Sequence, residues 1–217
     1  MKSFGNVLIL GDSYSTFEGY IPEGYDAYYI RNTDQRSDVC SPEQTWWGLL
    51  LEETNSKLVL NSSYSGTTIC HTGYDHADRS DISFTARLEK LIADGFFKEN
   101  KIDTVFIFGG TNDFWAGSPL GEFMYSNWQK QDLYSVFPAL CYMLDLLRKN
   151  APETKIIKII NTELGAEITE GMASICERYD IDCVKLFRID KIQGHPSIRG
   201  MEKIKDQIIE YIQKAQA

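Results

Sequence analysis

The sequence predicts an α/β protein: a three-layer α/β/α sandwich with a five-stranded parallel sheet at its centre. Three observations support this fold class. Five short apolar runs occur along the 217 residues, helical patterns alternate with them, and no linker or change of composition divides the chain. Alternating strands and helices imply a parallel sheet covered on both faces. A chain of this length fits one large domain, so we expect a single domain over residues 1–217.

The five apolar runs are the predicted strands. They are rich in Val, Ile, Leu and Phe and do not alternate with polar residues, which is typical of strands buried on both faces. They cover residues 6–10, 57–63, 103–110, 155–163 and 182–187.

The predicted helices lie between and after these strands, at 41–54, 81–95, 131–150, 166–180 and 197–215. The first begins with an N-cap at Ser41, a proline at the first helical position and a capping-box glutamine, Gln44. Gly95 can end the second helix. In the third, Pro138 either kinks the helix or marks its start.

Chemically useful residues follow several of the predicted strands. Ser13 comes directly after the first strand, Gly66 after the second and Asn112 after the third, and His195 precedes the last helix. In a parallel α/β sheet, ligands bind at the carboxyl ends of the strands. Turn formation alone would explain each residue separately. It would not explain why a nucleophile, a flexible backbone donor, an amide donor and a base all fall at one edge.

The motifs Gly-Asp-Ser at 11–13, Gly-Thr-Asn-Asp at 110–113 and Gly-His-Pro at 194–196, with the lone Gly66 between them, resemble the SGNH (GDSL-type) hydrolase superfamily over the whole chain. The resemblance implies a flavodoxin-like SGNH fold, with Ser13 as nucleophile and His195 as general base. It also implies an oxyanion hole made by the N–H groups of Ser13 and Gly66 and the side-chain amide of Asn112. The chemistry is coherent, because a serine hydroxyl is a weak nucleophile until a base accepts its proton.

The sequence departs from this family's pattern at one position. The family usually places an aspartate three residues before the catalytic histidine, and that position is occupied here by Ile192. Asp190 is the nearest carboxylate and is the expected third member of a Ser-His-Asp triad. The alternative is that a backbone carbonyl orients the imidazole, so that the site acts as a Ser–His dyad.

Four further residues are candidate substrate contacts: Asp12, Tyr14, Trp115 and Glu163. Asp12 can instead brace its own turn through local hydrogen bonds. The segment between Ser13 and the first helix is long and carries five tyrosines. Its aromatic side chains either line a wall for a carbohydrate or aromatic ester or pack the segment onto the body of the protein.

Composition excludes several classes of function. The formal net charge of −9 opposes binding to nucleic acid, which depends on Lys and Arg. No apolar stretch approaches the roughly 20 residues that a membrane helix needs. We see no signal-peptide pattern and therefore expect a cytoplasmic location. The ligand spacing around His71 and His76 matches no metal motif, so we expect neither a metal nor a cofactor.

These observations favour a serine esterase acting on a small-molecule ester with a short acyl group, such as an O-acetyl group on carbohydrate. A thioesterase or a lysophospholipase would use the same residues. A catalytically silent, SGNH-like carbohydrate-binding protein is the alternative from a different class, and the missing aspartate at position 192 is its support. The oligomeric state stays open.

Overall fold

A five-stranded parallel sheet forms the centre of the computed structural model, which describes residues 3–31 and 36–215. The strands lie in the order β2-β1-β3-β4-β5, with bounds β1 Asn6–Gly11, β2 Lys57–Ser63, β3 Thr104–Phe108, β4 Lys155–Ile160 and β5 Asp182–Lys185. After β1 the chain first adds β2 on one side and then β3 on the other. This reversal makes a crevice at the carboxyl ends of β1 and β3, where sheets of this kind bind ligands.

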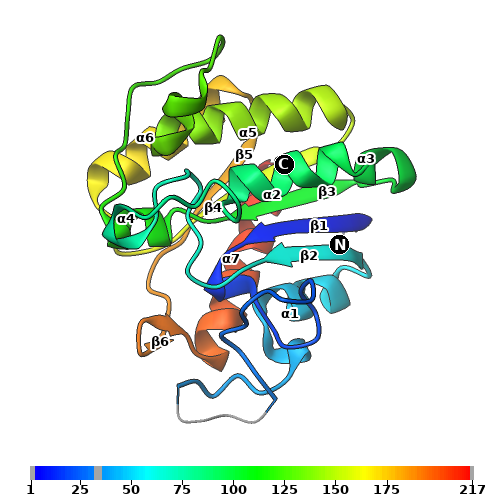
Figure 1. Ribbon diagram of the computed structural model, residues 1–217. Helices are drawn as coiled ribbons and strands as arrows, with labels where there is room; N and C mark the ends of the chain where they lie inside the picture. Colours follow the sequence, from blue (N-terminus) through cyan, green and yellow to red (C-terminus); the bar gives the residue numbers. More distant parts are fainter. Residues whose placement is uncertain (1–2, 32–35, 216–217) are drawn as a thin grey trace.

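Helices cover both faces of this sheet (Figure 1), which confirms the predicted sandwich. Helices α1 (Trp46–Glu53) and α7 (Ile198–Ala215) cover one face, and α2 (Phe84–Ala93), α5 (Val136–Asn150) and α6 (Ala166–Arg178) cover the other. Along β1, Val7 and Ile9 enter the first core, whereas Leu8 and Leu10 enter the second. All four are fully buried, so the absence of polar alternation in this strand follows from burial on both faces.

Several short elements were not predicted as separate elements, because each has too few residues for a hydrophobic period to show. They are η1 Ser13–Ser15, η2 Pro42–Gln44, η3 Tyr74–His76, α3 Phe96–Glu99, α4 Thr111–Ala116, η4 Lys130–Tyr134, β6 Lys191–Ile192 and β7 His195–Pro196. Two of them are important below, since α4 carries Asn112 and the β6–β7 hairpin carries His195.

The predicted helix at 41–54 is divided in two. The capping box of Ser41 and Gln44 is present, but it begins a single 3-10 turn. Thr45 then adopts an extended conformation and caps α1 by accepting a hydrogen bond from Gly48 N. In the third predicted helix, Pro138 lies in the first turn of α5, so this proline marks a helix start.

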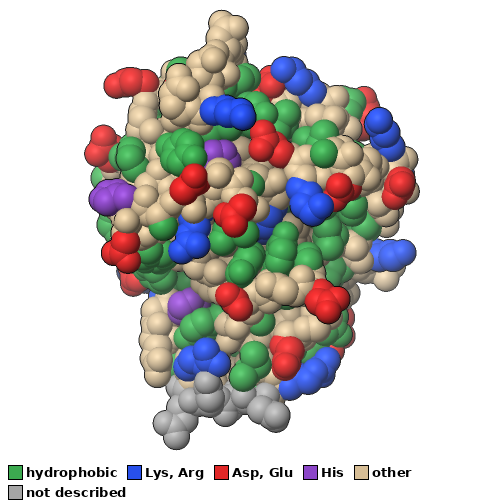
Figure 2. Space-filling view, in the orientation of Figure 1, with side chains coloured by type: hydrophobic (Ala, Val, Ile, Leu, Met, Phe, Trp, Pro, Cys, Tyr) green, Lys and Arg blue, Asp and Glu red, His purple; other side chains and the backbone are tan. Residues whose placement is uncertain are grey.

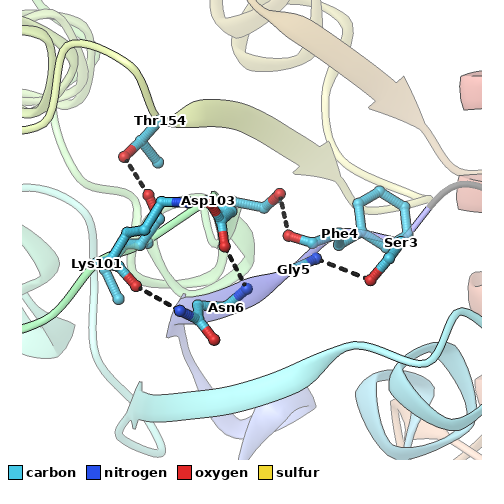
Figure 3. Close-up of polar contacts among 9 residues, drawn as sticks. Ser3, Phe4, Gly5, Asn6, Lys101, Asp103 and Thr154 are labelled. Atoms are coloured by element: carbon cyan, nitrogen blue, oxygen red, sulfur yellow. Dashed lines mark hydrogen bonds and ion pairs between the residues drawn. The ribbon is translucent and has the colours of Figure 1, made fainter.

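The amino-terminal edge of the sheet is closed by side chains that bond to neighbouring backbone (Figure 3). Asp103 accepts a hydrogen bond from Asn6 N at 2.8 Å, and the Asn6 amide donates to Lys101 O at 2.9 Å. Thr104 donates to Phe4 O at 2.8 Å. The polar groups of this edge therefore satisfy one another, which is a structural role and leaves the carboxyl edge for chemistry.

No helix within residues 3–31 and 36–215 is long and apolar enough to cross a membrane. On the face shown in Figure 2, acidic and basic side chains are interspersed rather than gathered by sign.

Candidate active site

Ser13 lies in a tight turn immediately after β1 and is almost completely buried, with 5% of its surface exposed. Asp12 Oδ1 accepts a hydrogen bond from Tyr14 N at 3.0 Å, which caps the turn. Gly11 is required at the end of the strand, because a Cβ there would lie 2.4 Å from Ser63 Oγ on β2. The turn is therefore fixed by its own sequence and by the neighbouring strand.

Three side chains from α1 and β2 donate hydrogen bonds to this turn. Trp46 Nε1 donates to Ser15 Oγ at 3.1 Å, and Trp47 Nε1 donates to Ser15 O at 2.9 Å. From β2, the Asn61 amide also donates to Ser15 O, at 2.8 Å. These bonds fix the backbone that follows Ser13.

His195 meets Ser13 across 182 positions of sequence: Nε2 lies 2.9 Å from Ser13 Oγ. The histidine is the first residue of β7, which pairs with β6 in a two-residue hairpin, and Ile192 lies directly opposite it. The turn residues Gln193 and Gly194 both have positive φ, 49° and 80°. Such turns match the twist of the two strands. The expected contact between Ser13 and His195 is thus present.

The second ring nitrogen of His195 contacts backbone rather than a carboxylate. Nδ1 lies 3.3 Å from the carbonyl oxygen of Gln193. The Asp190 carboxylate instead accepts a hydrogen bond from the hydroxyl of Ser197, which itself accepts a bond from Gly200 N in the first turn of α7. The expected contact of Asp190 with His195 is therefore wrong. The hairpin that begins at Lys191 separates Asp190 from the imidazole and leaves its carboxylate at the start of α7.

The Gln193 carbonyl decides the protonation of the ring. A carbonyl oxygen can only accept, so the neutral imidazole carries its proton on Nδ1 and directs the lone pair of Nε2 at Ser13. This is the tautomer that a general base needs. The alternative of an orienting backbone carbonyl thus matches the observed geometry.

Asn112 is held by two hydrogen bonds that fix the orientation of its amide. Its Nδ2 donates to Thr67 O at 3.0 Å, and its Oδ1 accepts from the hydroxyl of Tyr74 at 2.8 Å. Thr67 O uses one of the two N–H groups, and the other has no hydrogen-bond partner within residues 3–31 and 36–215. Gly66 precedes Thr67, is exposed and has φ 75°, a conformation that favours glycine. The amide of Asn112 therefore lies against the loop that carries Gly66.

Arg87 of α2 joins this loop to the nucleophile turn. Its guanidinium donates to Gly11 O at 3.0 Å, to Thr67 Oγ1 at 3.1 Å and also to Ser62 O. The side chain is 2% exposed, and its five donors suit several acceptors at once. A lone arginine in a helical pattern carries no sequence signal of burial, so the role of Arg87 could not be predicted from the sequence.

The four candidate substrate contacts have different environments. Asp12 and Tyr14 are fully buried, so neither faces a substrate in this structure. The Tyr14 hydroxyl donates to Gly194 O at 2.5 Å and supports the hairpin instead. Trp115 is 45% exposed, and its ring centroid lies 6.1 Å from that of His195. Glu163 is exposed and forms an ion pair with Lys191 at 2.8 Å. Trp115 and Glu163 thus stay candidates, and Asp12 and Tyr14 are better described as structural.

Burial dominates the electrostatics of the site. It lowers the pKa of His195 to about 4; the hydrogen bond to Gln193 opposes this shift, and the charge of Lys191 adds to it. Burial raises the pKa of Asp12 to about 7, because the carboxylate is remote from water; the hydrogen bond from Tyr14 N opposes this shift, and the charge of Asp113 adds to it. At neutral pH His195 is therefore uncharged and able to accept a proton.

The histidines of the 70–76 segment do not form a metal site. His71 is buried, with Nδ1 2.9 Å from Ser83 Oγ, whereas His76 is exposed. Within the described part of the chain, no group of three or more His, Cys, Asp and Glu side chains could hold a metal ion.

The model of the GDSL-like lipase/acylhydrolase family matches residues 5–212. The chain belongs to this family. Two solved structures support the assignment. A GDSL-like lipase from Bacteroides ovatus is 46% identical over 98% of this chain and 100% of its own, with a TM-score of 0.91. Another GDSL-like lipase, from Bacteroides uniformis, is 43% identical over 97% of this chain and 96% of its own, with a TM-score of 0.89. The resemblance inferred from the motifs is thus confirmed, and family membership indicates a hydrolase.

More distant structures share the fold of this GDSL-like protein. A family two carbohydrate esterase from Clostridium thermocellum, in complex with cellohexaose, is 16% identical over all of this chain and 66% of its own, with a TM-score of 0.66. At this identity the likeness concerns the fold alone. No curated protein matches the chain.

Proposed function

We propose that this protein is a serine esterase that hydrolyses short acyl esters, including O-acetyl groups on carbohydrate, through a Ser13–His195 dyad. The observation that carries the proposal is the 2.9 Å contact between Ser13 Oγ and His195 Nε2, with Nδ1 directed at the Gln193 carbonyl. A hydroxyl and a correctly protonated imidazole at this distance are the two groups that acyl transfer through serine needs.

In the proposed reaction, Ser13 Oγ attacks the ester carbonyl carbon while its proton passes to His195 Nε2. The carbonyl oxygen becomes an oxyanion, and the free N–H of Asn112 with the backbone N–H groups of Ser13 and Gly66 would stabilise it. The C–O bond to the alcohol then breaks, and Nε2 returns the proton to the departing oxygen. Water repeats the sequence on the acyl-enzyme and releases the acid.

The proposal of a carbohydrate substrate has two supports. Trp115 offers an exposed aromatic face beside the base, and aromatic faces stack on apolar surfaces such as those of sugar rings. The fold is also that of carbohydrate esterases, one of which binds cellohexaose.

Nitrophenyl esters of increasing acyl length, acetylated oligosaccharides and acyl thioesters, each with Ser13→Ala as blank, test this function. We expect the acetyl esters to turn over fastest and the Ser13→Ala protein to be inactive. A preference for long acyl chains would instead indicate a lysophospholipase, and a preference for thioesters would indicate a thioesterase. If a fluorophosphonate probe failed to label Ser13 in the folded protein, the catalytic function would be rejected in favour of a binding protein.

The pH dependence of kcat/KM should reflect the low pKa of His195. Only the neutral imidazole accepts a proton. Because the pKa of His195 is about 4 and not the ordinary 6.5, the ring stays neutral at pH values well below 6.5. We therefore expect the acid limb of kcat/KM to lie near pH 4, with activity constant from neutrality down to about pH 5. Circular dichroism at each pH controls for unfolding.

A half-maximal point near pH 6.5 in the folded protein would contradict this expectation. An inflection near pH 7 that disappears in Asp12→Asn would belong to Asp12, whose pKa is about 7.

A further inference from the structure

Tyr28 stacks face to face on the imidazole of His195. The two ring centroids are 3.5 Å apart, and the ring planes differ by 9°. The other aromatic neighbours of His195 meet it at larger distances and steeper angles: Tyr14 at 5.1 Å and 55°, Trp115 at 6.1 Å and 65°, and Tyr29 at 6.5 Å and 79°. One face of the base is therefore covered by a single parallel ring.

The segment that carries Tyr28 is bonded to both halves of the site. Tyr28 N donates to Thr16 Oγ1 at 2.9 Å, and Thr16 Oγ1 donates to Ser13 O at 3.0 Å. On the other side, the hydroxyl of Tyr29 donates to Pro196 O at 2.9 Å, next to the histidine. The position of the Tyr28 ring is thus defined relative to both the nucleophile and the base.

The dyad creates a specific need that this ring can meet. When Ser13 gives its proton to Nε2, the imidazole becomes a cation, and the Asp190 carboxylate that was expected to balance it lies on Ser197 instead. The charge of Lys191, which forms an ion pair with Glu163, has the same sign as the imidazolium and lowers the pKa of His195. The face of a tyrosine ring is electron-rich and attracts a cation, more strongly when both are shielded from water.

We infer that Tyr28 is a positioning residue that holds the plane of His195 and stabilises the imidazolium in the transition state, in the role that a carboxylate has in a triad. The inference rests on the proposed esterase function and deepens it. Tyr28 touches neither the ester nor the oxyanion, and it acts only through His195. Because the attraction is stronger for the cation than for the neutral ring, it lowers the barrier more than it strengthens substrate binding.

Two substitutions separate the aromatic face from the rest of the side chain. Tyr28→Phe keeps the ring and loses only the hydroxyl, which donates to Arg36 O at 3.1 Å. Tyr28→Leu keeps an apolar side chain over the imidazole but removes the π face. We expect Tyr28→Leu to lower kcat about 5- to 30-fold with KM within about twofold of wild type, and Tyr28→Phe to retain most of the activity.

The matched control is Tyr20→Leu. Tyr20 belongs to the same segment and packs on Trp47, with ring centroids 5.6 Å apart. The ring of Tyr20 contacts Phe17 and Trp47 and is not stacked on His195. Replacing Tyr20 by leucine should therefore leave kcat near the wild-type value. Melting temperatures of all four proteins identify any general loss of folding.

The rate of Ser13 labelling by a fluorophosphonate gives a second measurement that does not depend on the choice of substrate. In this reaction the Oγ–P bond forms, the P–F bond breaks and the proton again moves from Oγ to Nε2. We expect the labelling rate to fall in Tyr28→Leu and to recover in Tyr28→Phe. Equal rates or kcat values in the two variants, or a change in KM alone, would overturn the role of Tyr28. Failure of the wild-type protein to label would overturn the proposed function itself.

Discussion

Replacing His195 by alanine should abolish ester hydrolysis, whereas Asp190→Asn should leave it nearly unchanged. In serine hydrolases, removal of the base costs on the order of 10⁵ to 10⁶ in kcat. His195 is the group within 2.9 Å of Ser13 Oγ, so we expect a loss of this size in His195→Ala. Asp190→Asn should lower kcat by less than about threefold, because its carboxylate bonds to Ser197 and not to the imidazole.

The comparison is informative because Asp190→Asn is a conservative change. The asparagine oxygen can still accept the hydrogen bond of Ser197, so α7 should keep its start, and the melting temperature checks this. If Asp190→Asn instead lost about 10⁴ of kcat in a stably folded protein, the loss would match that of the orienting aspartate of a triad. The dyad would then be rejected, and His195 would have to move toward Asp190 during the reaction.

Asn112→Ala should lower kcat by about 10²- to 10³-fold with little change in KM, because loss of one oxyanion donor typically has this effect. The Asn112 amide is held rigidly by Thr67 O and the Tyr74 hydroxyl, so its remaining N–H needs no reorganisation when the oxyanion forms. Burial raises the pKa of Tyr74 to about 12, which keeps its hydroxyl protonated and donating over the working range. Steady-state kinetics with an acetyl ester measure the effect.

A control for Asn112→Ala must remove a neighbouring side-chain amide and leave the Asn112 N–H, the proposed oxyanion donor, in place. Asn161 at the end of β4 is also buried, and it donates to Thr111 Oγ1 at 3.1 Å in the first turn of α4. Asn161→Ala therefore loosens the same helix. An equal loss of kcat in both variants would attribute the effect to displacement of α4 and remove Asn112 from the oxyanion hole.

Both predictions depend on the positions of the loops around the site, and two buried ionisable side chains, Lys158 and Asp113, hold these loops. Lys158 on β4 is fully buried and donates to Gly109 O and Ile159 O, both at 2.8 Å, which fixes the turn before α4. Asp113 on α4 accepts from the backbone N–H of Ile69 at 2.9 Å and of Cys70 at 3.2 Å. Buried charges are tolerated when hydrogen bonds satisfy them. The bonds of Asp113 connect the loop that follows β2 with α4, which follows β3, so they position Asn112 relative to the Gly66 loop.

The general architecture was predictable because it follows from local hydrophobic patterns along the chain. Runs such as Val7–Leu10 are apolar at every position, and a strand buried on both faces has this property wherever it lies in the sheet. The positions of Ser13, Gly66, Asn112 and His195 after or near strand ends were readable for the same reason. The carboxyl ends of parallel strands share one edge, so the order of motifs along the chain predicts that these residues lie at that edge, and the contact between Ser13 and His195 agrees with this prediction.

The details of the site were not predictable, because they depend on geometry between segments far apart in sequence. Asp12 and Tyr14 neighbour the nucleophile in sequence, which suggested substrate contacts, yet the turn directs both into the interior. The long segment before α1 could either line the site or pack on the body. Tyr28 within this segment stacks directly on His195, and no period or motif distinguishes it from the other tyrosines.

The sequence by itself determined the sandwich, the family and the pair of residues, Ser13 and His195, that meet at the candidate site. Hydrophobic runs and the order of motifs are sufficient for this, because they do not depend on the detailed placement of side chains. Only the tertiary structure decided what orients the base. The two-residue turn at Gln193 and Gly194 returns the chain so tightly that a carbonyl of the turn, and not Asp190, reaches the imidazole. A shift of two residues in spacing changes the partner of His195, because a side chain reaches only what the backbone geometry brings within hydrogen-bonding distance.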